Sequence, residues 1–409
     1  MEQQLPSAGQ AGQKNQRRAL LGALFLMATS AIGPGFITQT GQFTYQLGAA
    51  FAFAILISIL IGIAVQLNVW RIIGLSGLKA QELANSVLPG AGLFLAILVS
   101  LGGFVFNVGN VAGGGLGLNS MLGLDPTLGG IVTALLAIGV FLSRRAGVAL
   151  DQIVVGLGAI MILVTLYVAL VSNPPVGEAL KNTFLPETID FAVITTLVGG
   201  TVGGYITYAG AHRMLDAGVS GPDSIKDISR SSVTGIIVTG IMRFLLFLAI
   251  LGVVSTGVAL DASGSIAAQA FGLAAGEVGI RLFGLILWGA SISSVIGAAF
   301  TSVSFLTTQK TSTRTKNLLT IGFILASSLV FMTLGKAPST LLIVAGAVNG
   351  LILPVGFGLL LVVATFKAKT LLGGYKYPLP LLLVGWASWL LSIYLGYKAL
   401  GGIAALWAG

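Results

Sequence analysis

Eleven stretches of the sequence are apolar and long enough to cross a membrane, and they limit the possible folds more than any other feature. A soluble protein carries about 25% charged residues, whereas this chain is 56% hydrophobic and only 8% charged. We therefore predict an all-α polytopic membrane protein. The stretches lie near residues 19–45, 48–73, 88–122, 127–143, 147–171, 190–215, 232–256, 279–306, 317–334, 339–366 and 378–398.

Two of these stretches, the first and the sixth, are interrupted by Gly-rich polar segments at residues 33–42 and 199–210. Unwinding a helix in lipid costs several kcal/mol for each freed backbone group, so such breaks persist only where they line a cavity. Matched breaks in two halves of a chain point to the central binding site of a secondary transporter. The order of the spans predicts a LeuT-type fold, with two inverted repeats of five helices and an eleventh helix.

The basic residues indicate how the chain is oriented and divided. With the N-terminus in the cytoplasm, sixteen Lys and Arg residues fall on the cytoplasmic side and four on the opposite side, as the positive-inside rule requires. We expect a disordered cytoplasmic tail at 1–18, a first five-helix repeat at 19–171, a second, inverted repeat at 190–366, and a cytoplasmic loop with the eleventh helix at 367–409.

The residues around both breaks resemble one transporter family. The segment Gly33-Pro34-Gly35-Phe36 is similar to the opening of span 1 in NRAMP metal transporters, and residues 200–205 (GTVGGY) are similar to the Gly-Ala-Thr-Val-Met-Pro-His pattern of span 6. This resemblance implies the LeuT-type fold and alternating access. It also implies a bacterial inner (cell) membrane location, with the N-terminus in the cytoplasm.

The departures from the family pattern concern the metal ligands. The Asp-Pro-Gly-Asn motif of span 1 is missing, and residues 19–70 contain no acidic residue. In the family comparison Gly203 takes the place of the span 6 methionine, Asn107 and Asn110 replace the acids associated with proton passage, and Arg243 replaces a span 7 asparagine. Divalent cations prefer carboxylate, imidazole or thioether ligands, so this chemistry predicts no metal site.

We therefore expect a secondary active transporter of a small organic carboxylate or zwitterion. The resemblance to relatives whose genes lie beside 5-oxoprolinase subunits suggests 5-oxoproline. The alternatives are an NRAMP-type transporter of manganese or magnesium and, from another class, a channel or non-transporting sensor. Enzyme motifs are absent, so neither an enzyme nor a cofactor is expected. We expect a monomer that contacts lipid, its small substrate and a coupling ion (sodium or a proton), but no nucleic acid.

Candidate substrate-binding residues cluster at the two breaks and on spans 3 and 7. The half-helix ends and neutral polar side chains can bind a substrate, while Arg243 in span 7 can grip a carboxylate. The coupling-ion candidates are the span 8 hydroxyls, since a sodium ion can lie between spans 1 and 8 in this fold. The substrate set is Gly35, Thr38, Gln39, Thr40, Asn107, Asn110, Gly203, Gly204, Tyr205 and Arg243, and the ion set is Ser291, Ser293 and Ser294.

Overall fold

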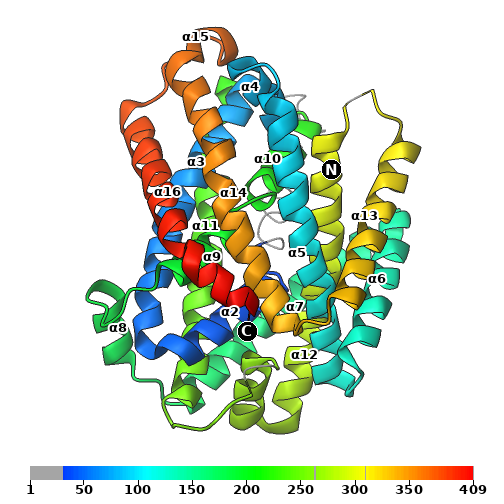
Figure 1. Ribbon diagram of the computed structural model, residues 1–409, viewed down its shortest axis with the longest axis vertical. Helices are drawn as coiled ribbons and strands as arrows, with labels where there is room; N and C mark the ends of the chain where they lie inside the picture. The colour runs from blue at the N-terminus through cyan, green and yellow to red at the C-terminus, as the bar shows by residue number, and fades with distance from the viewer. Residues whose placement is uncertain (1–30, 262–263, 309, 409) are drawn as a thin grey trace, which may run out of the picture.

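The computed structural model describes residues 31–261, 264–308 and 310–408, and these contain helices but no strand. The helices form an elongated bundle (Figure 1). Their bounds are α2 Pro34–Leu47, η1 Gly48–Ala50, α3 Phe51–Ser76, α4 Ala80–Val87, α5 Ala91–Leu122, α6 Pro126–Leu142, α7 Arg144–Val171, α8 Val176–Phe184, α9 Phe191–Val202, α10 Ile206–Asp216, η2 Pro222–Ser224, α11 Ile225–Val254, α12 Ile266–Leu306, α13 Thr313–Leu334, α14 Pro338–Phe366, α15 Ala368–Leu371 and α16 Leu379–Ala408.

The predicted apolar stretches are helical wherever the structure describes them. Among the described residues, eight helical stretches are long and apolar enough to cross a membrane by length and composition, or nine if the bent pair α7 and α8 forms one span. One of the eight, Pro34–Ser76, combines two predicted stretches, and α6 is a shorter apolar helix. The predicted tail at 1–18 and the beginning of the first stretch lie outside the described residues.

Several helices depart from the predicted pattern. The short helices α4 and α8 connect longer ones, and α8 turns 109° away from the end of α7. Helix α12 starts at Ile266, well before the predicted stretch, and bends at Gly276, which has φ +63°. A conformation with positive φ favours glycine because it has no Cβ. A search for apolar stretches long enough to span a membrane does not detect such short or bent helices.

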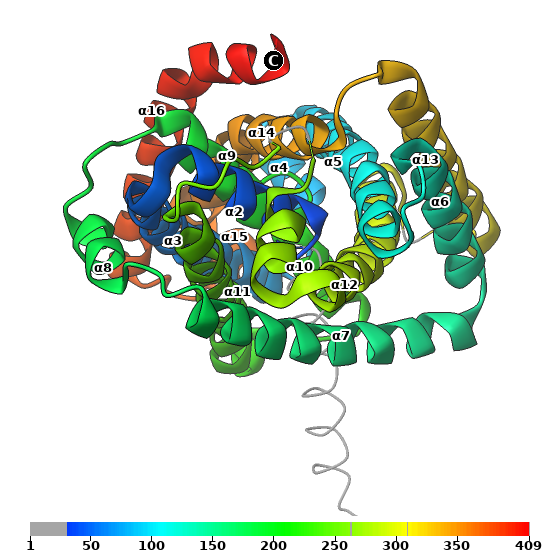
Figure 2. The same ribbon diagram turned by 90° about the horizontal axis from the view of Figure 1, so that it is seen from below.

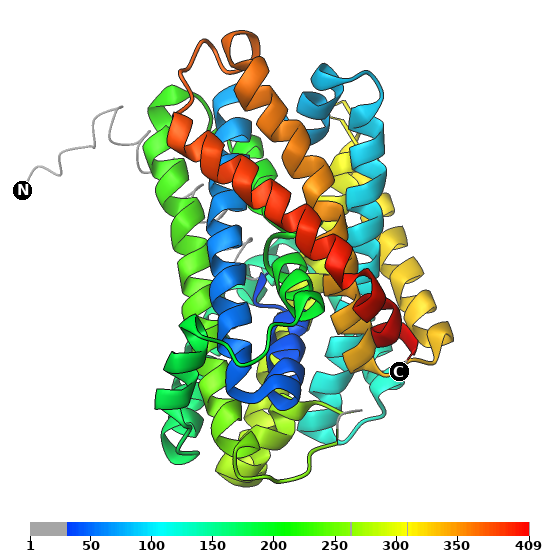
Figure 3. The same ribbon diagram turned by 60° about the vertical axis from the view of Figure 1, so that its left-hand side comes forward.

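Helices at corresponding places in the two predicted repeats pack against each other. The second span of each repeat, α3 and α11, forms one such pair, and the third spans, α5 and α12, form another. The fourth spans, α6 and α13, are also in contact. Seen from below, α2 and α10 lie between the α3–α11 pair and the α5–α12 pair, with α6 and α13 further out (Figure 2). Helix α16 crosses the outside of the bundle obliquely (Figure 3) and packs on α3, α9 and α14.

Glycines bring the backbones of α9 and α14 into direct contact. A Cβ at Gly199 would overlap the carbonyl oxygen of Gly346, and one at Gly203 would lie 2.7 Å from the carbonyl oxygen of Asn349. Gly203 therefore gives up its side-chain volume to a neighbouring helix, as small residues do at membrane helix interfaces. It does not open space for a substrate.

A glycine on α5 provides a stability prediction. A Cβ at Gly115 would overlap the carbonyl oxygen of Pro126 at the start of α6, so Gly115→Ala should force the two helices apart. Overpacking of this kind costs about 1–3 kcal/mol, and we expect a lower unfolding midpoint in detergent. Gly139→Ala on α6 is the control, because nothing lies within 4 Å of a Cβ there. Equal midpoints for both variants would contradict the packing argument.

Candidate functional site

The first break lies at Ile32 and Gly33, which separate the helical residue Ala31 from α2. The sequence placed this break at 33–42, but residues 34–47 form a continuous helix. Pro34 explains the difference, because proline is favoured at the first position of a helix and fixes its φ there. Gly35, Thr38, Gln39 and Thr40 therefore lie on the first turns of α2, all of them buried.

The second break lies between α9 and α10 at residues 203–205, inside the predicted segment 199–210. Gly203 is extended and Gly204 has φ +50°. The last turn of α9 cannot continue the hydrogen-bond ladder, so the carbonyl groups at 200–202 lack their intrahelical partners. A helix C-terminus carries partial negative charge, and this end of α9 therefore attracts a cation.

Gln39 joins the two broken helices to α14. Its Nε2 donates to the carbonyl oxygen of Leu342 at 3.4 Å. Its Oε1 lies 2.5 Å from the Cβ position of Gly200 in the last turn of α9. This Oε1 is buried without a hydrogen-bond partner among the described residues, and so is the hydroxyl of Thr38 one residue earlier. The Thr40 hydroxyl differs, since it donates to the carbonyl oxygen of Phe36.

The second group of buried polar atoms lies between α5 and the α9–α10 break. The ring of Tyr205 packs edge-on against Phe106, with 5.7 Å between centroids. Its hydroxyl faces the Asn110 side chain, but neither side chain makes a well-formed hydrogen bond within the described part of the chain. Phe106 also touches the Cβ position of Gly35. These contacts bring Asn110 and Tyr205 to the N-terminal end of α2.

Arg243 of α11 also reaches this region. It is 2% exposed, its Nη1 donates to the Thr201 hydroxyl at 3.0 Å, and its guanidinium lies 4.3 Å from the centroid of the Phe36 ring. The contact with Phe36 is a cation–π interaction. Arg243 therefore spans the end of α9 and the start of α2.

Asn107 and the span 8 serines are arranged differently from this cluster. Asn107 Nδ2 donates to Ser327 Oγ on α13 at 2.9 Å, so its side chain is turned toward α13. Ser291 and Ser293 donate to carbonyl groups of their own helix, and the Ser294 side chain is also engaged. Ser291 lies close to the start of α2, because its hydroxyl and Pro34 both touch the Cβ position of Gly113.

Asn349 on α14 is a central residue that the sequence did not indicate. Its Nδ2 donates to the carbonyl oxygens of Gly102 at 3.0 Å and Ala345 at 2.8 Å. Its Oδ1 packs on Gly204, where a Cβ would overlap it. Asn349 thus ties α5 and α14 to the α9–α10 break. A single Asn within an apolar span was the only signal available in the sequence.

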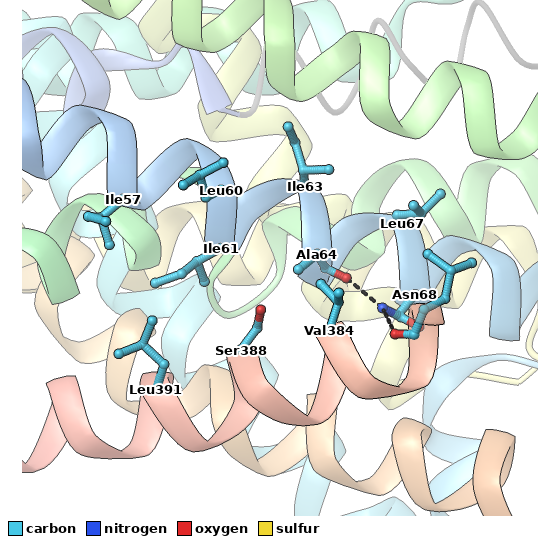
Figure 4. A pocket seen from close by; sticks show the side chains of 11 residues that line it. Ile57, Leu60, Ile61, Ile63, Ala64, Leu67, Asn68, Val384, Ser388 and Leu391 are labelled. Atoms are coloured by element: carbon cyan, nitrogen blue, oxygen red, sulfur yellow. Dashed lines mark hydrogen bonds between the residues drawn. The ribbon is translucent and has the colours of Figure 1, made fainter. Parts of the chain in front are cut away.

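One cavity lies far from this cluster, on the outer face between α3 and α16 (Figure 4). It has a volume of about 390 Å³, and Asn68 is the one amide side chain in its lining. The Asn68 amide donates to the carbonyl oxygen of Ala64 at 2.8 Å. No charged residue lines this cavity, so it lacks a group that could recognise an ion. The lining is Ile57, Leu60, Ile61, Ile63, Ala64, Leu67, Asn68, Leu381, Val384, Ser388 and Leu391.

The first and sixth spans are both interrupted, and their breaks lie beside each other inside the bundle of paired helices. This arrangement defines a polytopic membrane protein with the LeuT-like transporter fold. The chain belongs to the Nramp family, since residues 24–401 match the family described as natural resistance-associated macrophage protein-like. Nramp proteins are transporters, and the match confirms the family resemblance seen in the sequence.

Two curated relatives match almost the whole chain. An uncharacterized membrane protein of Bacillus subtilis (strain 168), YcsG, is 53% identical over 381 residues, which cover 93% of each chain. An uncharacterized membrane protein of Haemophilus influenzae is 51% identical over 373 residues, or 91% of this chain and 93% of the relative. Both relatives are bacterial.

Solved structures of a manganese transporter from Eremococcus coleocola share the fold. The complex with an aromatic bis-isothiourea substituted compound has a TM-score of 0.74 and 17% identity, and covers 99% of this chain and 90% of that one. A point mutant of the same transporter has a TM-score of 0.73 and 16% identity over the same shares. At this level of identity the likeness establishes the fold.

These comparisons overturn the expected substrate. We expected a small organic carboxylate or zwitterion such as 5-oxoproline, but the Nramp match and the manganese-transporter neighbours point to a divalent metal ion. The expectation was wrong because it treated carboxylate, imidazole and thioether groups as indispensable ligands. Hard cations also accept carbonyl oxygens and water.

Proposed function

We propose that this protein is a secondary transporter of a divalent metal ion, with manganese and magnesium as the preferred ions. The observation that carries the proposal is the buried Oε1 of Gln39, which lacks a hydrogen-bond partner in the described chain and lies beside the freed carbonyl groups of α9. Burying an acceptor without a partner costs free energy. A bound cation would remove that cost and would be favoured by the C-terminal end of α9.

The ligand chemistry narrows the choice of metal. In the described residues, no three His, Cys, Asp or Glu side chains gather where they could hold a metal ion. The groups that remain are the amide oxygen of Gln39, the hydroxyl of Thr38 and backbone carbonyl oxygens. Such oxygen ligands suit magnesium and manganese, whereas zinc and copper favour nitrogen or sulfur. Because neutral ligands compete weakly with hydration, the ion would keep several waters.

We propose that the ion binds between α2 and α9 and that transport proceeds by alternating access. The break at 203–205 lets α10 tilt independently of α9, and the break at Ile32 and Gly33 does the same for α2. The two five-helix repeats at 19–171 and 190–366, the cytoplasmic N-terminus and the bacterial cell membrane belong to this proposal. Ser291 remains the candidate for a coupling ion, because it lies beside Pro34 at the start of α2.

Uptake of manganese into proteoliposomes tests the proposed function. We expect saturable manganese uptake that magnesium inhibits and that excess zinc inhibits much less, because the site offers oxygen ligands. Protein-free vesicles measure the leak of manganese across the bilayer. Vesicles loaded with a chelator distinguish uptake from binding. A sodium or proton gradient, imposed in turn, identifies the coupling ion. Absent manganese and magnesium uptake, with labelled 5-oxoproline accumulating instead, would overturn the proposal.

A further inference from the structure

Arg243 leaves two of its three nitrogen atoms without a partner. Its Nη1 donates to the Thr201 hydroxyl, but Nε and Nη2 are buried and donate to no acceptor among the described residues. The sequence contains no Asp or Glu between Glu2 and Glu82, so α2 cannot supply a carboxylate. A buried guanidinium without a counter-charge is costly, and the fold must compensate for it.

The first turn of α2 lies against this guanidinium. Phe36, whose ring Arg243 covers, is the third residue of that helix. The amide protons of Gly35 and Phe36 have no acceptor within α2, because the first N–H groups of any helix lack one. The N-cap residue Gly33 has no side chain to cap them. The N-terminus of a helix carries partial positive charge and binds anions through these groups.

We propose that Arg243 and the first turn of α2 bind a small monovalent anion such as chloride. The anion would accept hydrogen bonds from the free Nε and Nη2 groups and from the amides of Gly35 and Phe36. Guanidinium and backbone N–H groups both donate hydrogen bonds, so together they suit a halide. The anion would neutralise Arg243 and supply the negative charge that a ligand carboxylate would otherwise provide.

The anion site gives the proposed metal site its electrostatic balance. Thr201, which Arg243 contacts, follows Gly200, which touches Gln39 Oε1. A divalent ion at Gln39 would therefore lie close to a fixed positive charge and would be repelled. An anion bound to Arg243 cancels its positive charge and so removes this repulsion. This role rests on the proposed function, but the binding of the anion itself does not.

The first test uses the purified full chain in detergent with a chelator and no divalent metal. Sodium isethionate is replaced by sodium chloride at constant ionic strength, and the unfolding midpoint is measured. We expect chloride to raise the midpoint by about 3 °C through ligand linkage. Arg243→Gln should abolish the shift, whereas Arg213→Gln, which removes an exposed arginine on α10, should retain it. An equal shift in all three proteins, or none in wild type, would overturn the anion site.

Arg243→Lys guards against a variant that fails to fold. Lysine keeps the charge but loses the planar fork of donors, so the shift should persist at reduced size. Broadening of the 35Cl resonance by wild-type protein, absent with Arg243→Gln, would report binding directly. Manganese binding should be about tenfold tighter in chloride than in isethionate for the wild type only. If manganese fails to bind in either salt while the chloride shift persists, the proposed function fails and the anion site stands.

Discussion

Gly204→Ala should reduce metal uptake to the level of protein-free vesicles. Gly204 has φ +50°, and a Cβ there would overlap Asn349 Oδ1. The left-handed conformation alone costs a non-glycine residue about 1–2 kcal/mol. The clash adds to this, because Asn349 cannot move away without losing its bonds to Gly102 and Ala345. The break between α9 and α10 would change its geometry, and with it the direction of the carbonyl groups at 200–202.

Gly218→Ala is the matched control for this variant. Gly218 also has a positive φ, +76°, but nothing lies within 4 Å of a Cβ there. It therefore carries the backbone cost without the clash. We expect Gly218→Ala to lower the unfolding midpoint slightly and to leave manganese uptake near that of the wild type. Wild-type uptake by Gly204→Ala would show that the geometry of the break does not govern transport.

Gln39→Leu should weaken manganese binding by at least about tenfold, which corresponds to the loss of about 1.4 kcal/mol from one good ligand. Leucine approximates the shape of glutamine but removes Oε1, the buried acceptor beside α9. The measurement is the manganese concentration for half-maximal uptake in proteoliposomes, with isothermal titration as the binding readout.

Gln66→Leu separates a binding effect from a folding effect. Gln66 is also buried, donates through Nε2 to the carbonyl oxygen of Ser232 at 2.9 Å, and has an Oε1 without a partner in the described chain. It lies on α3, and its hydrogen bond runs to α11 rather than to α2 or α14. Both variants should lower the unfolding midpoint by similar amounts, but only Gln39→Leu should change manganese affinity. Equal affinities for the two variants would remove Gln39 from the metal site.

The sequence predicted the scaffold better than the substrate. Long apolar runs and the glycines at 203 and 204 mark helices and a break, because hydropathy and backbone freedom act locally. The first break was misplaced within its segment, because Pro34 starts a helix there. The predicted substrate was wrong because the lack of carboxylate, imidazole and thioether side chains shows only which metal ligands are absent. It does not show which atoms replace them. Gln39 could be named as a candidate from the sequence, but its contact with α9 depends on how distant helices pack.

The direct backbone contact between α9 and α14 has a mechanical consequence. Gly199 lies against the Gly346 carbonyl and Gly203 against the Asn349 carbonyl, so at these two points no side chain separates the backbones and sliding would drive backbone atoms into each other. We therefore expect α9 and α14 to move as one rigid unit during the transport cycle. The element free to swing is α10, beyond the break at 203–205. Crosslinks between α9 and α14 should then leave the cycle intact, whereas crosslinks from α10 to α3 should stop it.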